Sequence, residues 1–159
     1  MVDLVGFVYE LAHSDASFRR LIEKYHGKYH ENKYMLVLTI YNEEIAKEEV
    51  ESFRKHIEGK IVVEIGAGIG LLALEMAKYA KKVYAFELDP AWSWIFVRKY
   101  LYNKPSNLFF VFGDAEEFAD KIKPDIVIVY TCSAIPYFLK IARKFSNKII
   151  LNGKLLEVK

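Results

Sequence analysis

From Lys60 onward the chain alternates short apolar runs with longer segments of helical length, and this alternation limits the folds open to it. The apolar runs cover residues 61–65, 83–86, 108–112, 126–130 and 148–151. The helix-length segments between them cover residues 70–80, 91–103, 115–122 and 134–145. Strands that are apolar on both faces and alternate with helices are typical of a parallel sheet covered on both sides. We therefore expect an α/β fold with a doubly wound, mainly parallel sheet and helices on both faces.

A helical segment is expected to precede this sheet. Asn42 is a suitable N-cap, with Glu43 and Glu44 in the first turn, and apolar residues then recur at helical spacing until Gly59. Helical spacing is also present within the first 25 residues, whereas residues 25–34 lack periodicity and are expected to form a loop, either a lid or a plain connector. The apolar run at residues 34–41 fits a strand or a buried helical turn.

The domain organisation expected from length and composition is simple. With 159 residues, of which 53% are hydrophobic, the chain is long enough for one well-buried core. We assign residues 1–58 to an N-terminal helical extension and residues 59–159 to the cofactor-binding core of one compact domain. At the end of the core, Asn152-Gly153 predicts a tight turn that folds the last strand back as a hairpin.

Composition excludes several kinds of site. The single cysteine, Cys132, excludes a disulfide framework or a multi-cysteine zinc site, and we expect it to be buried at a strand end. His26 and His30 stand at a metal-ligand spacing, but Gly27 lies between them, so a polar loop is favoured and no metal site is expected. The longest uncharged run is too short for a membrane span, and no targeting signal is visible, so we expect a cytoplasmic protein.

The turn after the first apolar run carries three alternating glycines, Gly66, Gly68 and Gly70. In a doubly wound sheet this turn lies at the carboxyl ends of the strands, where ligands bind. Glycine allows the tight turn and lets backbone N–H groups approach a ligand, next to the positive end of the following helix. The turn therefore predicts a small-molecule site, although a purely structural turn is the alternative.

The spacing of these glycines separates two classes of ligand. The dinucleotide fingerprint is G-x-G-x-x-G, whereas this turn is G-x-G-x-G and has Leu71 at the third dinucleotide position. Glu64, two residues before the first glycine, would also add negative charge beside a pyrophosphate. It suits a ligand with a positive amino or sulfonium group, unless it serves as a helix cap or salt-bridge partner.

The sequences "VVEIGAGIG" and "VYAFELDP" together resemble the class I S-adenosylmethionine-dependent methyltransferases, over the chain from about Lys60 to its end. The resemblance implies that the turn contacts the methionyl part of S-adenosylmethionine and that Glu64 lies near its amino group. Glu87, with Leu88 beside it, would accept hydrogen bonds from the two ribose hydroxyls. The residues assigned to the turn contact are Gly66, Ala67, Gly68 and Gly70.

Two further acids near these strands have competing interpretations. By the resemblance, Asp114 binds the adenine amine and the Ala115 N–H meets a ring nitrogen. The alternative interpretation is that Asp114 is a helix N-cap, with Glu117 as its capping-box partner. Asp89 competes with Glu87 for the ribose, but it precedes Pro90 and is expected to cap the next helix.

The segment after the fourth apolar run, "YTCSAIPYF", is expected to face the methyl acceptor. Its candidates for catalysis or acceptor contact are Tyr130, Thr131 and Tyr137. The sequence lacks the Asn/Asp-Pro-Pro-Tyr signature of methyltransferases that act on adenine amines. "AKKVYAFELDP" is nevertheless similar to the ribosomal RNA adenine dimethylases, again without their signature at this segment.

The sequence thus predicts a methyltransferase that transfers a methyl group from S-adenosylmethionine to RNA, protein or a small molecule. The alternative is a cofactor-binding module without activity, or a subunit completed by a partner protein or a second copy. The net charge of +2 gives no long-range basic field, and no membrane association is expected. A cluster of basic residues either contacts nucleic acid or forms a solvated helix face: Lys140, Arg143, Lys144 and Lys148.

Overall fold

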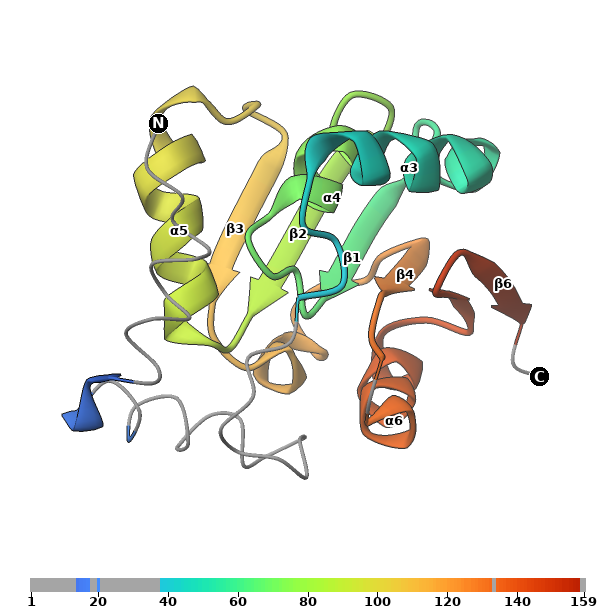
Figure 1. Cartoon of the computed structure of the whole chain (residues 1–159). Helices are drawn as coiled ribbons and strands as arrows, with labels where there is room; N and C mark the ends of the chain where they lie inside the picture. The colour runs from blue at the N-terminus through green and yellow to red at the C-terminus, as the bar shows by residue number, and fades with distance from the viewer. Residues whose placement is uncertain (1–13, 18–19, 21–37, 133, 158–159) are drawn as a thin grey trace.

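The computed structural model describes residues 14–17, 20, 38–132 and 134–157 (Figure 1). Most of the predictions for the first 37 residues, including the His26 and His30 pair and the loop at residues 25–34, lie outside this part of the chain. The described residues form a six-stranded sheet flanked by helices.

The strand order confirms a doubly wound sheet. The order is β3-β2-β1-β4-β5-β6, so the chain moves outward from β1 to one edge and then returns to β4 on the other side. The first five strands are parallel, and β6 pairs antiparallel with β5 through the predicted turn at Asn152-Gly153. The strands are β1 (Ile61–Ile65), β2 (Lys82–Glu87), β3 (Leu108–Phe112), β4 (Ile126–Val129), β5 (Lys148–Leu151) and β6 (Lys154–Glu157).

Helices cover the two faces of the sheet with separate cores. On one face pack α3 (Glu43–Ile57), α4 (Leu71–Met76) and α5 (Pro90–Tyr100), the last continued by a 3-10 turn, η1 (Leu101–Asn103). On the other face pack α6 (Ile135–Phe145) and a 3-10 turn, η2 (Ala115–Phe118). No helix of the described residues is long and apolar enough to cross a membrane.

Helix α3 forms as its sequence predicts. The side chain of Asn42 caps it by accepting a hydrogen bond from the Ile45 N–H at 2.8 Å. The helix then buries a single apolar stripe made by Ala46, Val50, Phe53 and Ile57. Most of the stability of such a helix comes from the buried stripe rather than from intrinsic propensity.

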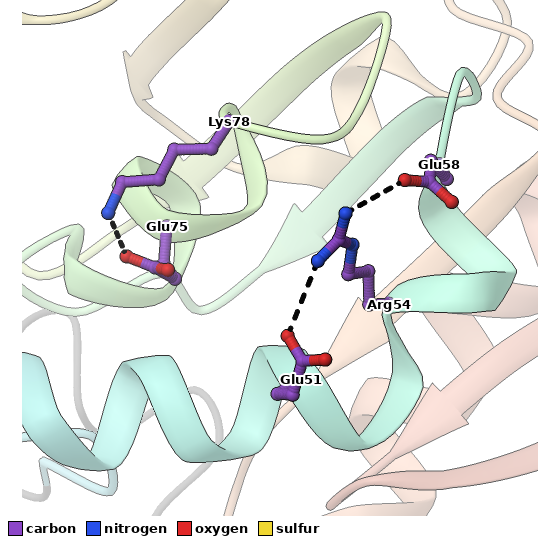
Figure 2. Close-up of polar contacts among 5 residues, drawn as sticks. All are labelled: Glu51, Arg54, Glu58, Glu75 and Lys78. Carbon is purple, nitrogen blue, oxygen red and sulfur yellow. Dashed lines mark hydrogen bonds and ion pairs between the residues drawn. The ribbon is translucent and has the colours of Figure 1, made fainter.

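Ion pairs form along α3 and in the turn that ends α4 (Figure 2). Arg54 lies between Glu51, at 3.7 Å, and Glu58, at 3.2 Å, and its guanidinium lies 4.1 Å from the ring centroid of Tyr79 in the turn after α4. Lys78 pairs with Glu75 at 2.6 Å. Glu75 is buried, whereas the Arg54 pairs are exposed, and exposed pairs contribute less than about 1 kcal/mol each.

Helix α4 is shorter than the predicted segment 70–80, because backbone carbonyls at its end accept hydrogen bonds from outside the helix. Asn107 donates through its side-chain amide to the carbonyls of Ala77 and Ala80. The Gly59 N–H donates to the carbonyl of Tyr79 at 3.0 Å. Tertiary partners thus replace the last helical turn.

The predicted helix at residues 115–122 was wrong, since η2 has only four residues. The N–H groups of Lys121 and Ile122 both donate to the Phe118 carbonyl, which closes a turn instead of extending a helix. Pro124 follows two residues later and disfavours helical geometry before it. One face of the sheet consequently receives less cover than the prediction implied.

Candidate cofactor-binding site

A cleft opens at the carboxyl ends of β1, β2 and β4, where the strand order changes direction. The space between its walls, open solvent at its mouth included, is about 810 Å³. Nearly all the predicted site residues line it: Glu64, Gly66, Ala67, Gly68, Glu87, Leu88, Asp114, Ala115, Tyr130, Thr131 and Tyr137. Gly70 is not among the lining residues.

The glycine turn keeps the floor of the cleft clear of side chains. Gly66 and Gly68 have left-handed backbones, with φ of 77° and 60°. A Cβ at Gly66 would lie 3.2 Å from the ring of Phe138, and one at Gly68 would lie 2.8 Å from Leu38. Any larger residue would therefore force these walls of the cleft apart.

The backbone N–H groups of the turn bond within the protein, contrary to the expectation that they face a ligand. Those of Gly66 and Ala67 both donate to the carbonyl of Phe86 at 2.9 Å. That of Gly68 donates to the side chain of Glu87. The turn is thus held against the end of β2. A ligand could approach its backbone closely, but these N–H groups are already used within the protein.

Gly70 has a structural role in this turn. It precedes α4 with a φ of 86°, and a Cβ there would lie 2.4 Å from the ring of Phe96. The third glycine of the motif therefore lets helices α4 and α5 approach each other.

Glu87 is fixed at the end of β2 by two backbone donors. Its Oε1 accepts from the Gly68 N–H at 2.7 Å, and its Oε2 accepts from the Asp89 N–H at 2.8 Å. Burial, followed by the nearby Asp89 carboxylate, raises the pKa of Glu87 to about 8, although the N–H donors oppose this shift. Each carboxylate oxygen can accept more than one hydrogen bond, so Glu87 retains capacity for ligand hydroxyls.

Asp89 has the other role that the sequence offered. Its Oδ1 accepts from the Ala91 N–H at 2.9 Å, and Pro90 occupies the first position of α5. The prediction that Asp89 caps this helix is confirmed.

Glu64 is a buried carboxylate that faces the cleft. It is 3% exposed, and no group of the described residues donates a hydrogen bond to its Oε2. Burial, and then the charge of Glu87, raise the pKa of Glu64 well above its usual value. Its place in β1 excludes the helix-cap alternative. Because an unpaired buried polar atom costs stability, a cationic donor in the cleft would be bound strongly here.

Asp114 does cap the segment after β3. Its Oδ1 accepts from the Glu116 N–H at 3.0 Å, at the start of η2. Asp114 and Ala115 also line the cleft. Contact with adenine remains a prediction.

The segment after β4 is held from two sides. The Tyr130 hydroxyl donates to Glu49 of α3 at 2.7 Å, and the backbone of Thr131 bonds to the side chain of Asn152. Burial and Glu49 raise the pKa of Tyr130, and burial likewise raises the pKa of Tyr137. Both hydroxyls therefore keep their protons, which suits them to orient a substrate and not to act as bases. Cys132 in this segment is exposed, so the expected burial was wrong.

This geometry agrees with a comparison of the chain with known protein families. Residues 28–151 match the TRM5/TYW2 methyltransferase domain. The chain belongs to the TRM5/TYW2 methyltransferase family.

Two individual proteins are similar to this TRM5/TYW2 domain. It is 35% identical over 99 residues to ribosomal RNA small subunit methyltransferase A of Mycoplasmopsis synoviae, covering 58% of this chain and 36% of that protein. The crystal structure of Trm5b from Pyrococcus abyssi is similar with a TM-score of 0.57 and 26% identity, covering 70% of this chain and 34% of that one. The chain spans less than two fifths of the length of its first curated relatives.

A more distant structure shows the same fold. It is a SAM-dependent methyltransferase from Thiobacillus denitrificans in complex with S-adenosyl-L-homocysteine, with a TM-score of 0.56 and 13% identity over 71% of this chain and 50% of that one. The fold of the TRM5/TYW2 domain is thus that of the class I S-adenosylmethionine-dependent methyltransferases, as the sequence predicts.

Sequence reasoning missed part of the cleft wall of this TRM5/TYW2 domain. Residues 38–40 line the cleft ahead of α3, and residues 38–41 form neither the strand nor the helical turn that their apolar run allowed. Trp92, Phe138 and Ile141 add apolar surface from α5 and α6. The only sequence signal for residues 38–40 was their hydrophobicity, which does not specify a contact partner.

Proposed function

We propose that this TRM5/TYW2 domain binds S-adenosylmethionine in the cleft and transfers its methyl group to RNA. The observation that carries the proposal is the pair of buried acids, Glu64 with an unpartnered oxygen and Glu87 held by two N–H donors, at the ends of neighbouring strands. A cationic amine and a pair of vicinal hydroxyls are the groups that such acids would bind. The bound cofactor supplies an electrophilic methyl group on a sulfonium.

The residues present fit that cofactor. Glu64 would bind the amino group, and Glu87 beside Leu88 would bind both ribose hydroxyls. The turn would lie against the methionyl chain, since its two cleft-lining glycines, Gly66 and Gly68, allow close approach of the backbone. Asp114 and Ala115 would bind the adenine ring. Gly70, which supports α4, is left out of this contact set.

An RNA acceptor is favoured over protein or a small molecule by one relative, which is named as a ribosomal RNA methyltransferase. The acceptor nucleotide would enter beside Tyr130, Thr131 and Tyr137, which line the cleft. Tyr137 would orient it by hydrogen bonding, whereas Tyr130, whose hydroxyl donates to Glu49, would act only as an acceptor. The role of this segment is therefore positioning, which brings the acceptor atom in line with the methyl group.

The test is transfer of tritium from methyl-labelled S-adenosylmethionine to RNA, with protein and small-molecule extracts as parallel acceptors. We expect label in RNA, abolished by Glu87→Ala and kept by Glu51→Ala, which changes an exposed glutamate of α3. Label confined to protein or to small molecules would contradict the RNA acceptor. Cofactor binding with no transfer to any acceptor would support a binding module completed by a partner.

A further inference from the structure

On the face of the sheet where η2 packs, this short 3-10 turn covers less of the strands than a full helix would. Phe118 of η2 packs against Phe86 near the carboxyl end of β2, with ring centroids 5.2 Å apart. Nearer the start of the strands, Tyr84 is half-buried and Phe109 of the edge strand β3 is 41% exposed. An aromatic side chain on an exposed sheet edge is a candidate contact for a partner.

Tyr84 and Phe109 form one aromatic surface. They are direct neighbours in the β2–β3 register, and their ring centroids lie 5.3 Å apart at an interplanar angle of 23°. Both rings project from the same face of the sheet, because paired residues of neighbouring strands share a face. β3 forms the edge of the sheet farthest from β6 (Figure 1).

Lysines surround these rings. The Lys82 Nζ lies 5.8 Å from the ring centroid of Tyr84 and 5.6 Å from that of Phe109. The Lys104 Nζ lies 5.7 Å from the ring centroid of Phe109 and donates to the Leu108 carbonyl, which fixes it there. We call Lys82, Tyr84, Lys104 and Phe109 the lysine–aromatic face.

The charge along residues 81–113, the segment that carries β2 and β3, is one-sided. Its basic residues are Lys81, Lys82 and Lys104 beside the two strands, and Arg98 and Lys99 in α5, which packs on the other face of the sheet. The acids of the same segment are Glu87 and Asp89, and both are buried. The exposed acids Glu117 and Asp120 belong to the η2 connection, which covers the sheet beside Phe86. A polyanion therefore complements the edge formed by β2 and β3.

We propose that the lysine–aromatic face binds single-stranded RNA that flanks the methylated nucleotide. Bases would stack on Phe109 and Tyr84 while Lys82 and Lys104 contact phosphates, the combination by which single strands are bound. β2 runs from Lys82 to Glu87 at the cleft, about 17 Å for a strand of this length, so the lysine–aromatic face lies within a few nucleotides' reach of the cofactor site. This inference rests on the proposed RNA acceptor.

The basic cluster on α6, which the sequence suggested first, is the weaker candidate. Lys144 in that cluster is already paired with Glu116 of η2. Lys140 and Arg143 are exposed, and neither has an aromatic ring contact among the described residues. The α6 cluster therefore serves as the matched control.

The test is fluorescence anisotropy of the full chain with a fluorescein-labelled single-stranded RNA of about 12 nucleotides. Phe109→Leu keeps apolar volume but removes the stacking ring, and we expect it to weaken the Kd about tenfold. Phe109→Tyr should retain the wild-type Kd. Lys82→Ala should lower the slope of log K against log salt by about 0.7. The double variant Lys140→Ala/Arg143→Ala should bind RNA as the wild type does.

Unchanged affinity in Phe109→Leu and Lys82→Ala, or loss of affinity in the α6 variant instead, would overturn the proposal. The proposal would also be overturned if the wild type failed to bind RNA and Phe109→Leu converted a dimer into a monomer in sedimentation. The lysine–aromatic face would then be a protein interface. Titration of the same variants with S-adenosylhomocysteine checks their folding. If RNA binds through Phe109 and no sulfur nucleoside binds, the proposed function fails, whereas RNA binding by the lysine–aromatic face stands.

Discussion

The side-chain amide of Asn152 forms two hydrogen bonds with the backbone of Thr131, across 21 residues of sequence. Its Oδ1 accepts from the Thr131 N–H and its Nδ2 donates to the Thr131 carbonyl, both at 2.9 Å. The Asn152 N–H also donates to the carbonyl of Val129 at 2.9 Å. The β5–β6 turn therefore holds the segment that leaves β4, which lines the cleft.

Replacing Asn152 should destabilise the fold. Asn152→Ala removes both hydrogen bonds to Thr131 and places a less tolerant residue at a φ of 49°, so the free energy of unfolding should fall by about 1–3 kcal/mol. Asn152→Asp keeps the acceptor oxygen, so its unfolding free energy should fall by less. Urea denaturation measures both. Asn147→Ala, at an exposed position, should change stability by less than about 0.5 kcal/mol, and an equal loss there would refute the anchoring role.

The glycine turn provides a second comparison. Gly70→Ala would place a Cβ 2.4 Å from Phe96 at a φ of 86°, and we expect a loss of at least about 2 kcal/mol in unfolding free energy. At Gly59 the φ is 70° and nothing lies within 4 Å of the added Cβ, so Gly59→Ala should cost only about 1 kcal/mol. Denaturant midpoints that do not differ between the two variants would contradict the packing role of Gly70.

The buried acids predict how stability depends on pH. The pKa of Glu87 is raised to about 8 in the fold, above the value of 4.5 expected when it is exposed, and the pKa of Glu64 is raised as well. Between these values the folded state holds protons that the unfolded state has released. These groups therefore make the ligand-free protein lose stability as the pH rises from about 4.5 to about 8.

Glu64→Gln should remove part of that loss. Urea denaturation at about pH 5 and about pH 8 measures the unfolding free energy of both proteins. Relative to the wild type, the unfolding free energy of the variant should be higher at about pH 8 than at about pH 5 by about 1–3 kcal/mol, because the variant has no carboxylate at this position to ionise in the core. Glu51→Gln, an exposed change, should run parallel to the wild type. A Glu64→Gln profile parallel to the wild type would show that Glu64 is not titrating in this range.

The strands were predictable because parallel strands buried on both faces leave continuous apolar runs, as at residues 61–65 and 126–129. The end of α4 and the short length of η2 were not predictable from the sequence. They depend on tertiary partners such as Asn107 and on the turn closed at Phe118. The motif identified most of the cleft wall. It also implied a ligand role for Gly70, which instead packs against Phe96, since sequence spacing does not show which way a glycine faces.

The contribution of residues 38–40 to the cleft illustrates the same limit. They contact the glycine turn through Leu38, about 30 residues away in sequence, and their composition alone does not select that partner. The assignment of residues 1–58 as a helical extension stays a prediction, of which α3 is the part described.

The most direct test of the account is calorimetric titration of the protein with S-adenosylmethionine, S-adenosylhomocysteine and a nicotinamide dinucleotide. We predict binding of the two sulfur nucleosides and none of the dinucleotide. Glu87→Ala should weaken that binding at least about tenfold through the lost ribose hydrogen bonds, and Glu51→Ala should leave it unchanged. Absence of sulfur nucleoside binding, or equal affinity in Glu87→Ala, would contradict the cofactor site proposed for this cleft.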